Sequence, residues 1–191
     1  MKLIIISLFT ITLLGCAAAG VPYTSDPMKK LNYAYELMNT EGRGLAAERL
    51  GLEALADLEK SNNLYEVAEA HTFLGLYYKS RSYRYHKDFY TKHNEYDPTA
   101  GKSIEHFKLA AEAFEKDGDY WGVSKALFAM GNAFLTDNDK VNGCNKFSES
   151  LEIYRSDKNV FVGRVHPHNP AFESYEAMVE GFITKHCANG V

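Results

Sequence analysis

The sequence lacks the motifs that most often identify an enzyme or a nucleic-acid-binding protein. It contains no nucleophile elbow, no His-Glu-x-x-His helix and no glycine-rich loop to hold phosphates. Its formal net charge is -4, whereas nucleic-acid-binding domains are usually strongly basic. We therefore expect no catalytic site, no cofactor and no nucleic-acid partner. An enzyme with a dispersed active site is the alternative that a motif search leaves open.

Long apolar runs are also absent after residue 14. The one such run, residues 3–14, follows Lys2 and is interrupted only by Ser7, Thr10 and Thr12. It is long enough for the apolar core of a secretory signal, but a membrane-spanning helix needs about 20 residues. The N-terminus is therefore expected to direct secretion rather than to span a bilayer.

Cysteine is scarce, and the first of the three cysteines directly follows the apolar run. Residues 13–16 read LLGC, which resembles the lipobox of bacterial lipoproteins. In that family the cysteine thiol is diacylated and the chain is cut just before it. The resemblance implies that residues 1–15 are a lipoprotein signal peptide and that Cys16 is the lipidation site. More than one acyl chain gives stable membrane anchoring.

The residue after this cysteine bears on location. In the lipoprotein family an Asp there tends to retain the protein in the inner membrane, and this chain has Ala17. The resemblance therefore implies a lipid-anchored protein of the bacterial outer membrane that faces the periplasm. An ordinary signal peptide, cut after Ala17 or Ala19, is the alternative.

Period-two alternation, which marks half-buried strands, is missing from the mature chain. Residues 16–27 show no periodicity and are interpreted as a lipidated tether, and residues 28–191 are interpreted as one helical domain. The expected fold class is all-α. Gly, Pro and capping residues divide the pattern into helices at about 27–39, 43–60, 64–85, 101–116, 120–136, 140–156 and 169–187.

An internal repeat organises this helical pattern. LEKSNNLYEVAEAHTFLGLYY (58–78) aligns without gaps to FEKDGDYWGVSKALFAMGNAF (114–134) at an offset of 56. Both segments end with a large residue, a Gly and an aromatic residue in the same spacing. This spacing resembles the first helix of a tetratricopeptide (TPR) repeat, in which the Gly lets the second helix approach closely.

The second helix of a TPR has a small-x-x-x-aromatic-x-x-small pattern, which recurs at 103–110 and, more loosely, at 143–150. A more degenerate pair precedes them. The resemblance implies a short solenoid of about three helical hairpins with a C-terminal capping helix and a concave groove, which in this family binds peptides or proteins. The Pro that often closes a repeat is missing, and an unrelated helical bundle is the alternative.

The two remaining cysteines form an even pair in an expected oxidising compartment. Cys144 lies near the start of one predicted helix, and Cys187 ends the next. If those helices form an antiparallel hairpin, as in TPR repeats, the two thiols lie side by side. We therefore predict a disulfide that holds the last helix as a cap.

One repeat unit spans about 40 residues, from Glu115 to Arg155. The 56-residue offset exceeds this unit by 16 residues, and the surplus falls in an arm at about 79–100. It contains no Gly or Pro before Pro98, which predicts that the preceding helix continues to about Lys92. Residues 79–93 carry a local charge of +4 with interleaved aromatics, and Arg and Tyr are enriched at binding hot spots. One interpretation is a projecting arm that contacts a protein, an anionic lipid or a cell-wall polymer. The other is that the aromatic side chains pack on neighbouring helices and the charged side chains form a solvated face. The candidate partner-binding residues are Arg81, Tyr83, Arg84, Tyr85 and Tyr90.

Histidines do not form a recognisable metal motif. His71 and His106 have no ligand partner at helical spacing, and His86 and His93 are too far apart on one helix to share an ion. His166-x-His168 lacks an evident third ligand. No metal site is predicted.

These expectations favour a membrane-anchored adaptor or assembly factor that binds a partner protein in the periplasm, as TPR lipoproteins of secretion, pilus or envelope assembly do. A peptidoglycan-associated lipoprotein is the alternative.

Overall fold

The computed structural model describes residues 21–163 and 169–187. Cys16, the signal peptide, His166 and His168 lie outside these ranges. The expected all-α class is confirmed, since the described residues form nine helices and no strand. The helices are α1 (Pro27–Met38), α2 (Gly44–Leu58), α3 (Leu64–Lys79), α4 (Arg81–Tyr85), α5 (Lys87–Lys92), α6 (Gly101–Asp117), α7 (Tyr120–Thr136), α8 (Lys140–Arg155) and α9 (Tyr175–Cys187).

Side-chain caps fix most helix starts where the sequence predicts them. Asp26 caps α1, Asn63 caps α3, and Asp119 and Asp139 cap α7 and α8 by accepting hydrogen bonds from backbone N–H groups of the first turn. At the end of α6, Gly118 adopts a φ of +80°, a conformation that glycine reaches without steric cost. The local signals therefore place the helices before any packing is considered.

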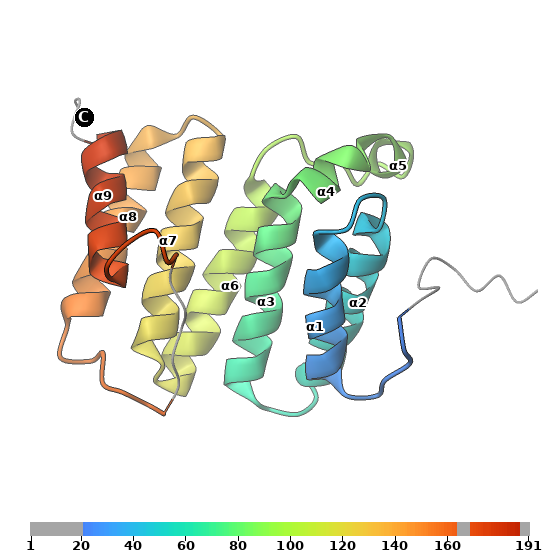
Figure 1. Cartoon of the computed structure of the whole chain (residues 1–191), viewed down its shortest axis with the longest axis horizontal. Coiled ribbons are helices and arrows are strands. Elements are labelled where there is room, and N and C mark those ends of the chain that lie inside the picture. The colour runs from blue at the N-terminus through green and yellow to red at the C-terminus, as the bar shows by residue number, and fades with distance from the viewer. Residues whose placement is uncertain (1–20, 164–168, 188–191) are drawn as a thin grey trace, which may run out of the picture.

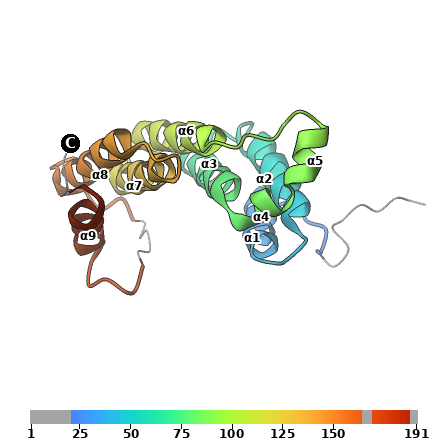
Figure 2. The ribbon, with the colours of Figure 1, turned by 90° about the horizontal axis from the view of Figure 1, so that it is seen from above.

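The long helices pack as antiparallel neighbours in chain order. The closest-packed pairs are α1 with α2, α3 with α6, and α7 with α8, and they follow one another along the molecule (Figure 1). Seen from above, α2, α6 and α8 lie toward one side, and α1, α3, α7 and α9 lie toward the other (Figure 2). The molecule is thus a curved double row of helices.

Glycine permits the closest approach within two of these pairs. A Cβ built on Gly75 of α3 would lie 2.7 Å from the ring of Phe107 on α6, and a Cβ on Gly131 of α7 would lie 2.7 Å from Phe147 on α8. Both rings are fully buried. The predicted role of these glycines in close helix packing is confirmed, and the same Gly–Phe contact occurs in the α3–α6 pair and in the α7–α8 pair.

The C-terminal helix is held against α8 as expected. Cys144 and Cys187 are joined by a disulfide, so the predicted pairing is confirmed. The buried hydroxyl of Tyr175 is 2.8 Å from Ser150 Oγ. The predicted start of this helix at 169 is wrong, because α9 begins only at Tyr175, where Ser174 Oγ accepts a hydrogen bond from the N–H of Ala177.

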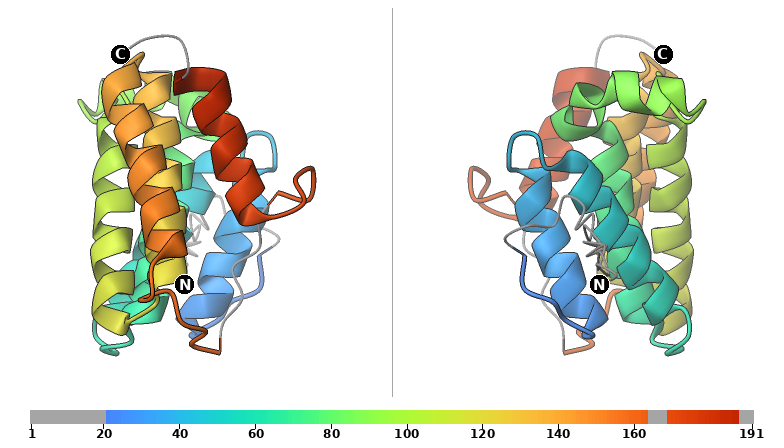
Figure 3. Two further views of the ribbon diagram at one scale, coloured as in Figure 1. Left: turned by 90° about the vertical axis from the view of Figure 1, so that its left-hand side faces the viewer. Right: turned by 90° about the vertical axis from the view of Figure 1, so that its right-hand side faces the viewer.

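The predicted continuous helix from 64 to about Lys92 is also wrong. Ser80 has an extended conformation with ψ of 164°, and its hydroxyl accepts a hydrogen bond from the N–H of Tyr83. This cap ends α3 and starts α4, and a second break at His86 separates α4 from α5. Both short helices therefore run across the ends of their neighbours (Figure 3).

Candidate functional site: a groove on the inner helices

A cavity of about 410 Å³ opens on the side of the molecule formed by α1, α3, α7 and α9. Its wall is mainly apolar and aromatic, with polar groups from α3 and α7. Such cavities are the usual form of a ligand site in proteins. Its lining includes Tyr35, Tyr65, Glu69, Thr72, Leu76, Lys79, Lys125, Phe128, Ala129, Asn132, Tyr175 and Met178.

Helical periodicity explains why these side chains converge. On α3 the lining residues follow one another at intervals of three or four, the spacing that places side chains on one face of a helix. The same holds on α7 for Lys125, Phe128 and Asn132. Because these two faces lie side by side, the sequence creates one continuous surface from two distant segments.

Two lysines, Lys79 and Lys125, and the carboxylate of Glu69 are the charged groups of this surface. Burial lowers the pKa of Lys79, and it also lowers the pKa of Lys125, where the nearby Glu69 and Asp119 carboxylates act in the opposite direction. Lys79 Nζ lies 5.8 Å from the centre of the Phe107 ring. In the described part of the chain, Lys79 has no carboxylate within ion-pair distance. A partly desolvated ammonium group is therefore available to a ligand in the groove.

The groove also offers neutral hydrogen-bonding groups. Asn132 donates one amide hydrogen to the carbonyl of Phe128, which leaves its amide oxygen and second hydrogen for a ligand. No cluster of three or more metal-ligating side chains occurs in residues 21–163 and 169–187. Chemically, this surface suits binding of an extended, partly apolar segment.

Two of the five residues predicted to contact a partner are buried and cannot form an open contact surface. Tyr83 and Tyr90 are only 2% and 1% exposed, which corrects the expectation that all five project from the arm. The hydroxyl of Tyr90 donates to Glu48 Oε2 at 2.6 Å and lies 2.7 Å from the hydroxyl of Tyr77. The alternative interpretation, with aromatics packed on neighbouring helices, describes these two residues.

Burial and the Glu48 carboxylate both raise the pKa of the tyrosines that surround Glu48. Tyr78 donates to the other oxygen of Glu48 at 2.8 Å, so this one carboxylate on α2 binds hydroxyls from α3 and α5. Desolvation raises the pKa of Tyr77, Tyr78 and Tyr90 well above the usual range. These hydroxyls therefore stay protonated and serve as donors that fix the arm to the body.

The other three predicted residues are exposed. Arg81 and Tyr85 line a second cavity of about 530 Å³ between the α1–α2 loop and α4, and Tyr85 is 65% exposed. Arg84 is exposed and donates to the carbonyl of Lys79 at 2.8 Å. These residues remain candidates, but they lie outside the groove described above.

The structure brings together two histidines that the sequence pattern does not pair. His71 on α3 and His106 on α6 face each other with Nδ1 atoms 3.0 Å apart, and the ring of Tyr78 stacks on His106 at 5.4 Å. Helical spacing within one segment could not reveal a pair that forms between two helices. The antiparallel register that places Ser103 against Gly75 could have predicted it.

The chain matches no known family model, no curated protein and no solved structure. Within the residues that the structure describes, no helix is long and apolar enough to cross a membrane.

Proposed function

We propose that this protein is a membrane-anchored adaptor that holds an extended segment of a partner protein in the groove on α3 and α7. The observation that carries the proposal is the groove itself, an apolar surface with a partly desolvated cation on the concave side of a helical array. A surface of this kind binds a segment through several side chains along its length.

The fold proposal is a short TPR-like solenoid. Its support is the repeated Gly–Phe contact at Gly75–Phe107 and Gly131–Phe147 and the chain-order packing of antiparallel helices. Arrays of this type are built from repeats that contact their neighbours and leave an extended concave face. In this proposal α9 is the terminal cap, and α4 and α5 are the surplus of the middle repeat.

The location proposal is an outer-membrane lipoprotein that faces the periplasm. It rests on the LLGC sequence at 13–16 and on Ala17. The disulfide between Cys144 and Cys187 suits an oxidising compartment. Substitution Cys16→Ala tests the anchor directly, since we expect loss of acylation and release from the membrane fraction; unchanged fractionation contradicts it.

Site-specific photocrosslinking in intact cells tests the groove. A benzoylphenylalanine at Thr72 or Asn132 lies on the groove wall, whereas the same group at the exposed Lys108 or Asn145 lies on the helices of the outer side. We expect discrete adducts with one protein from the groove positions and none from the outer positions. Retention of the disulfide in each variant controls for folding.

Three results would oppose the proposal in different ways. Adducts only from the outer positions would move the binding site away from the groove. Sedimentation of the protein with purified sacculi, without protein adducts, would favour the peptidoglycan-associated alternative. Loss of function from one acidic or histidine substitution, with stability unchanged, would favour an enzyme.

A further inference from the structure

The arm at 79–100 is a firmly held platform with a different inner and outer face. Its inner face consists of Tyr83 and Tyr90, which pack against α2 and α3 in the N-terminal core cluster. Asp97 N–H donates to the hydroxyl of Tyr83 at 2.8 Å and brings the end of the arm back to its start. The outer face is therefore presented in a fixed shape.

Exposed positive side chains gather on the outside of the arm. Residues 81–93 carry four cations and one carboxylate, Asp88, although the whole chain is acidic. None of the four cations forms an ion pair with a described residue. Tyr85 and Phe89 protrude between them and are 65% and 44% exposed. The four cations are Arg81, Arg84, Lys87 and Lys92.

The position of the arm relative to the chain start is informative. The described chain begins at Val21, which packs against the core cluster that also contains Tyr83 and Tyr90. Along the longest axis of the molecule, Figures 1 and 2 show α4 and α5 at the same end as this first segment. Five peptide units join Cys16 to Val21 and span at most about 18 Å. An acyl anchor at Cys16 therefore keeps this end of the molecule close to the bilayer.

We propose that the outer face of α4 and α5 docks on an anionic lipid surface. The inference rests on the proposed lipid anchor, because the anchor brings the arm and the headgroups together. Lys and Arg near a membrane are attracted to anionic headgroups, and aromatic side chains settle at the interface between headgroups and acyl chains. The arm combines both kinds of side chain at the anchored end. Docking there holds α1 and α2 at the bilayer and directs α7 to α9 away from it.

Amide hydrogen exchange on the full-length, membrane-extracted protein tests this docking. The protein is placed in nanodiscs of phosphatidylcholine alone or with about one third phosphatidylglycerol. We expect the amides of 81–93 to exchange at least three-fold more slowly on the anionic discs, and 0.5 M salt to remove the difference because it screens surface charge. Equal exchange on both discs would overturn the proposal.

A matched pair of variants separates the effect of the four arm cations from the effect of the net charge of the chain. The arm variant carries Arg81→Gln, Arg84→Gln, Lys87→Gln and Lys92→Gln. The control variant loses the same charge at exposed lysines elsewhere. Only the arm variant should lose the protection on anionic discs, and loss in both would overturn the assignment to the arm. The control substitutions are Lys60→Gln, Lys108→Gln, Lys116→Gln and Lys185→Gln.

The lipid-anchor proposal and the docking proposal can be contradicted separately. If the chain does not remain on the discs, the lipid-anchor proposal fails. The arm is then tested by co-sedimentation of the same chain with phosphatidylglycerol vesicles, where equal binding of wild type and arm variant overturns the docking. Protection of 81–93 by purified sacculi or by a protein, with none from anionic discs, would likewise replace the lipid surface as the partner.

Discussion

Gly75 on α3 lies so close to Phe107 on α6 that an added Cβ would meet the ring at 2.7 Å. Phe107 is fully buried, and the hydroxyl of Ser103 donates to the Gly75 carbonyl at 2.7 Å, so neither helix can shift without breaking other contacts. We expect Gly75→Val to lower the free energy of unfolding by about 3 kcal/mol, as overpacked cores do. Urea unfolding measures the loss.

The matched control for this substitution is Ala56→Val at an exposed position on α2. It should cost only about 0.5 kcal/mol, the difference in helix propensity. Equal losses of unfolding free energy at both positions would contradict a tight contact between Gly75 and the Phe107 ring.

Tyr90 has a structural role, which a hydroxyl deletion can demonstrate. Tyr90→Phe keeps the ring and removes a donor from the Glu48 carboxylate, so we expect a loss of about 1–3 kcal/mol in the free energy of unfolding. Tyr85→Phe removes a hydroxyl from an exposed ring and should leave stability unchanged. If Tyr90→Phe is also neutral, the hydroxyl network does not hold the arm.

The His71–His106 pair predicts an acid-sensitive stability. Burial, the neighbouring His71 and the positive Lys102 lower the pKa of His106 to about 4, and burial lowers the pKa of His71 against the opposing effect of Glu59 and Glu105. The unfolded chain takes up protons at a pKa near 6.5, before the folded chain does. Stability is therefore complete above pH 6.5 and falls between pH 6.5 and pH 4.

Each pKa unit corresponds to about 1.4 kcal/mol, and partial solvent exposure of the pair reduces the effect. We expect a loss of about 1–2 kcal/mol between pH 7 and pH 4 that His106→Gln largely removes. The control is His93→Gln at an exposed position. Equal pH slopes in wild type and His106→Gln would contradict the assignment; urea unfolding across this pH range supplies the measurement.

The disulfide should stabilise the C-terminal end of the molecule. It closes a loop of 43 residues, which corresponds to about 4 kcal/mol in the chain-entropy treatment. We expect a Cys144→Ser, Cys187→Ser double variant to unfold at lower urea and to expose α9 first by hydrogen exchange. A reducing agent should destabilise the wild type and leave the double variant unaffected, and insensitivity of both would exclude a stabilising role.

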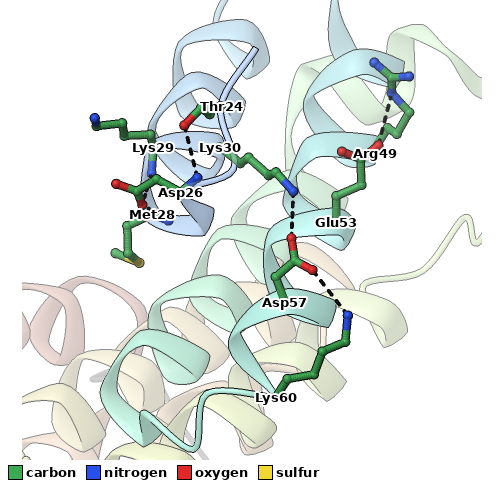
Figure 4. Close-up of polar contacts among 9 residues, drawn as sticks. All are labelled: Thr24, Asp26, Met28, Lys29, Lys30, Arg49, Glu53, Asp57 and Lys60. Atoms are coloured by element: carbon green, nitrogen blue, oxygen red, sulfur yellow. Dashed lines mark hydrogen bonds and ion pairs between the residues drawn. The ribbon is translucent and has the colours of Figure 1, made fainter.

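Ion pairs between surface residues offer a weaker set of contacts. Lys30 Nζ lies 2.6 Å from Asp57 Oδ2 and joins α1 to α2, and Lys60 contacts the other oxygen of the same carboxylate at 3.3 Å (Figure 4). Hydrogen bonds from Lys30 and Lys60 lower the pKa of Asp57. Pairs that solvent reaches contribute little to stability, because water and salt screen their charges. The first helix pair is therefore held mainly by its apolar contacts.

Local signals in the sequence determined most ends of the long helices, the Gly–aromatic repeat and the pairing of the two cysteines. Each of these depends on neighbouring residues or on one antiparallel hairpin, which is why they could be predicted. The arm could not, because Ser80 is an ordinary polar residue in an unbroken helical pattern until its hydroxyl caps a second helix. In a continuous helix, Tyr83 and Tyr90 would not make their buried contacts. The break at Ser80 lets the Tyr83 ring pack against Tyr77 and lets the Tyr90 hydroxyl hydrogen-bond with Tyr77 and Glu48.

The groove and the histidine pair likewise exist only in three dimensions. Residues on α3 and α7 are separated by α4 to α6 in the chain, and only the packing of successive helices makes them one surface. Helical periodicity in the sequence determined which face of each helix is apolar. Burial of those faces against one another, the largest favourable contribution to folding, decided which tyrosines lie inside and which cations are exposed.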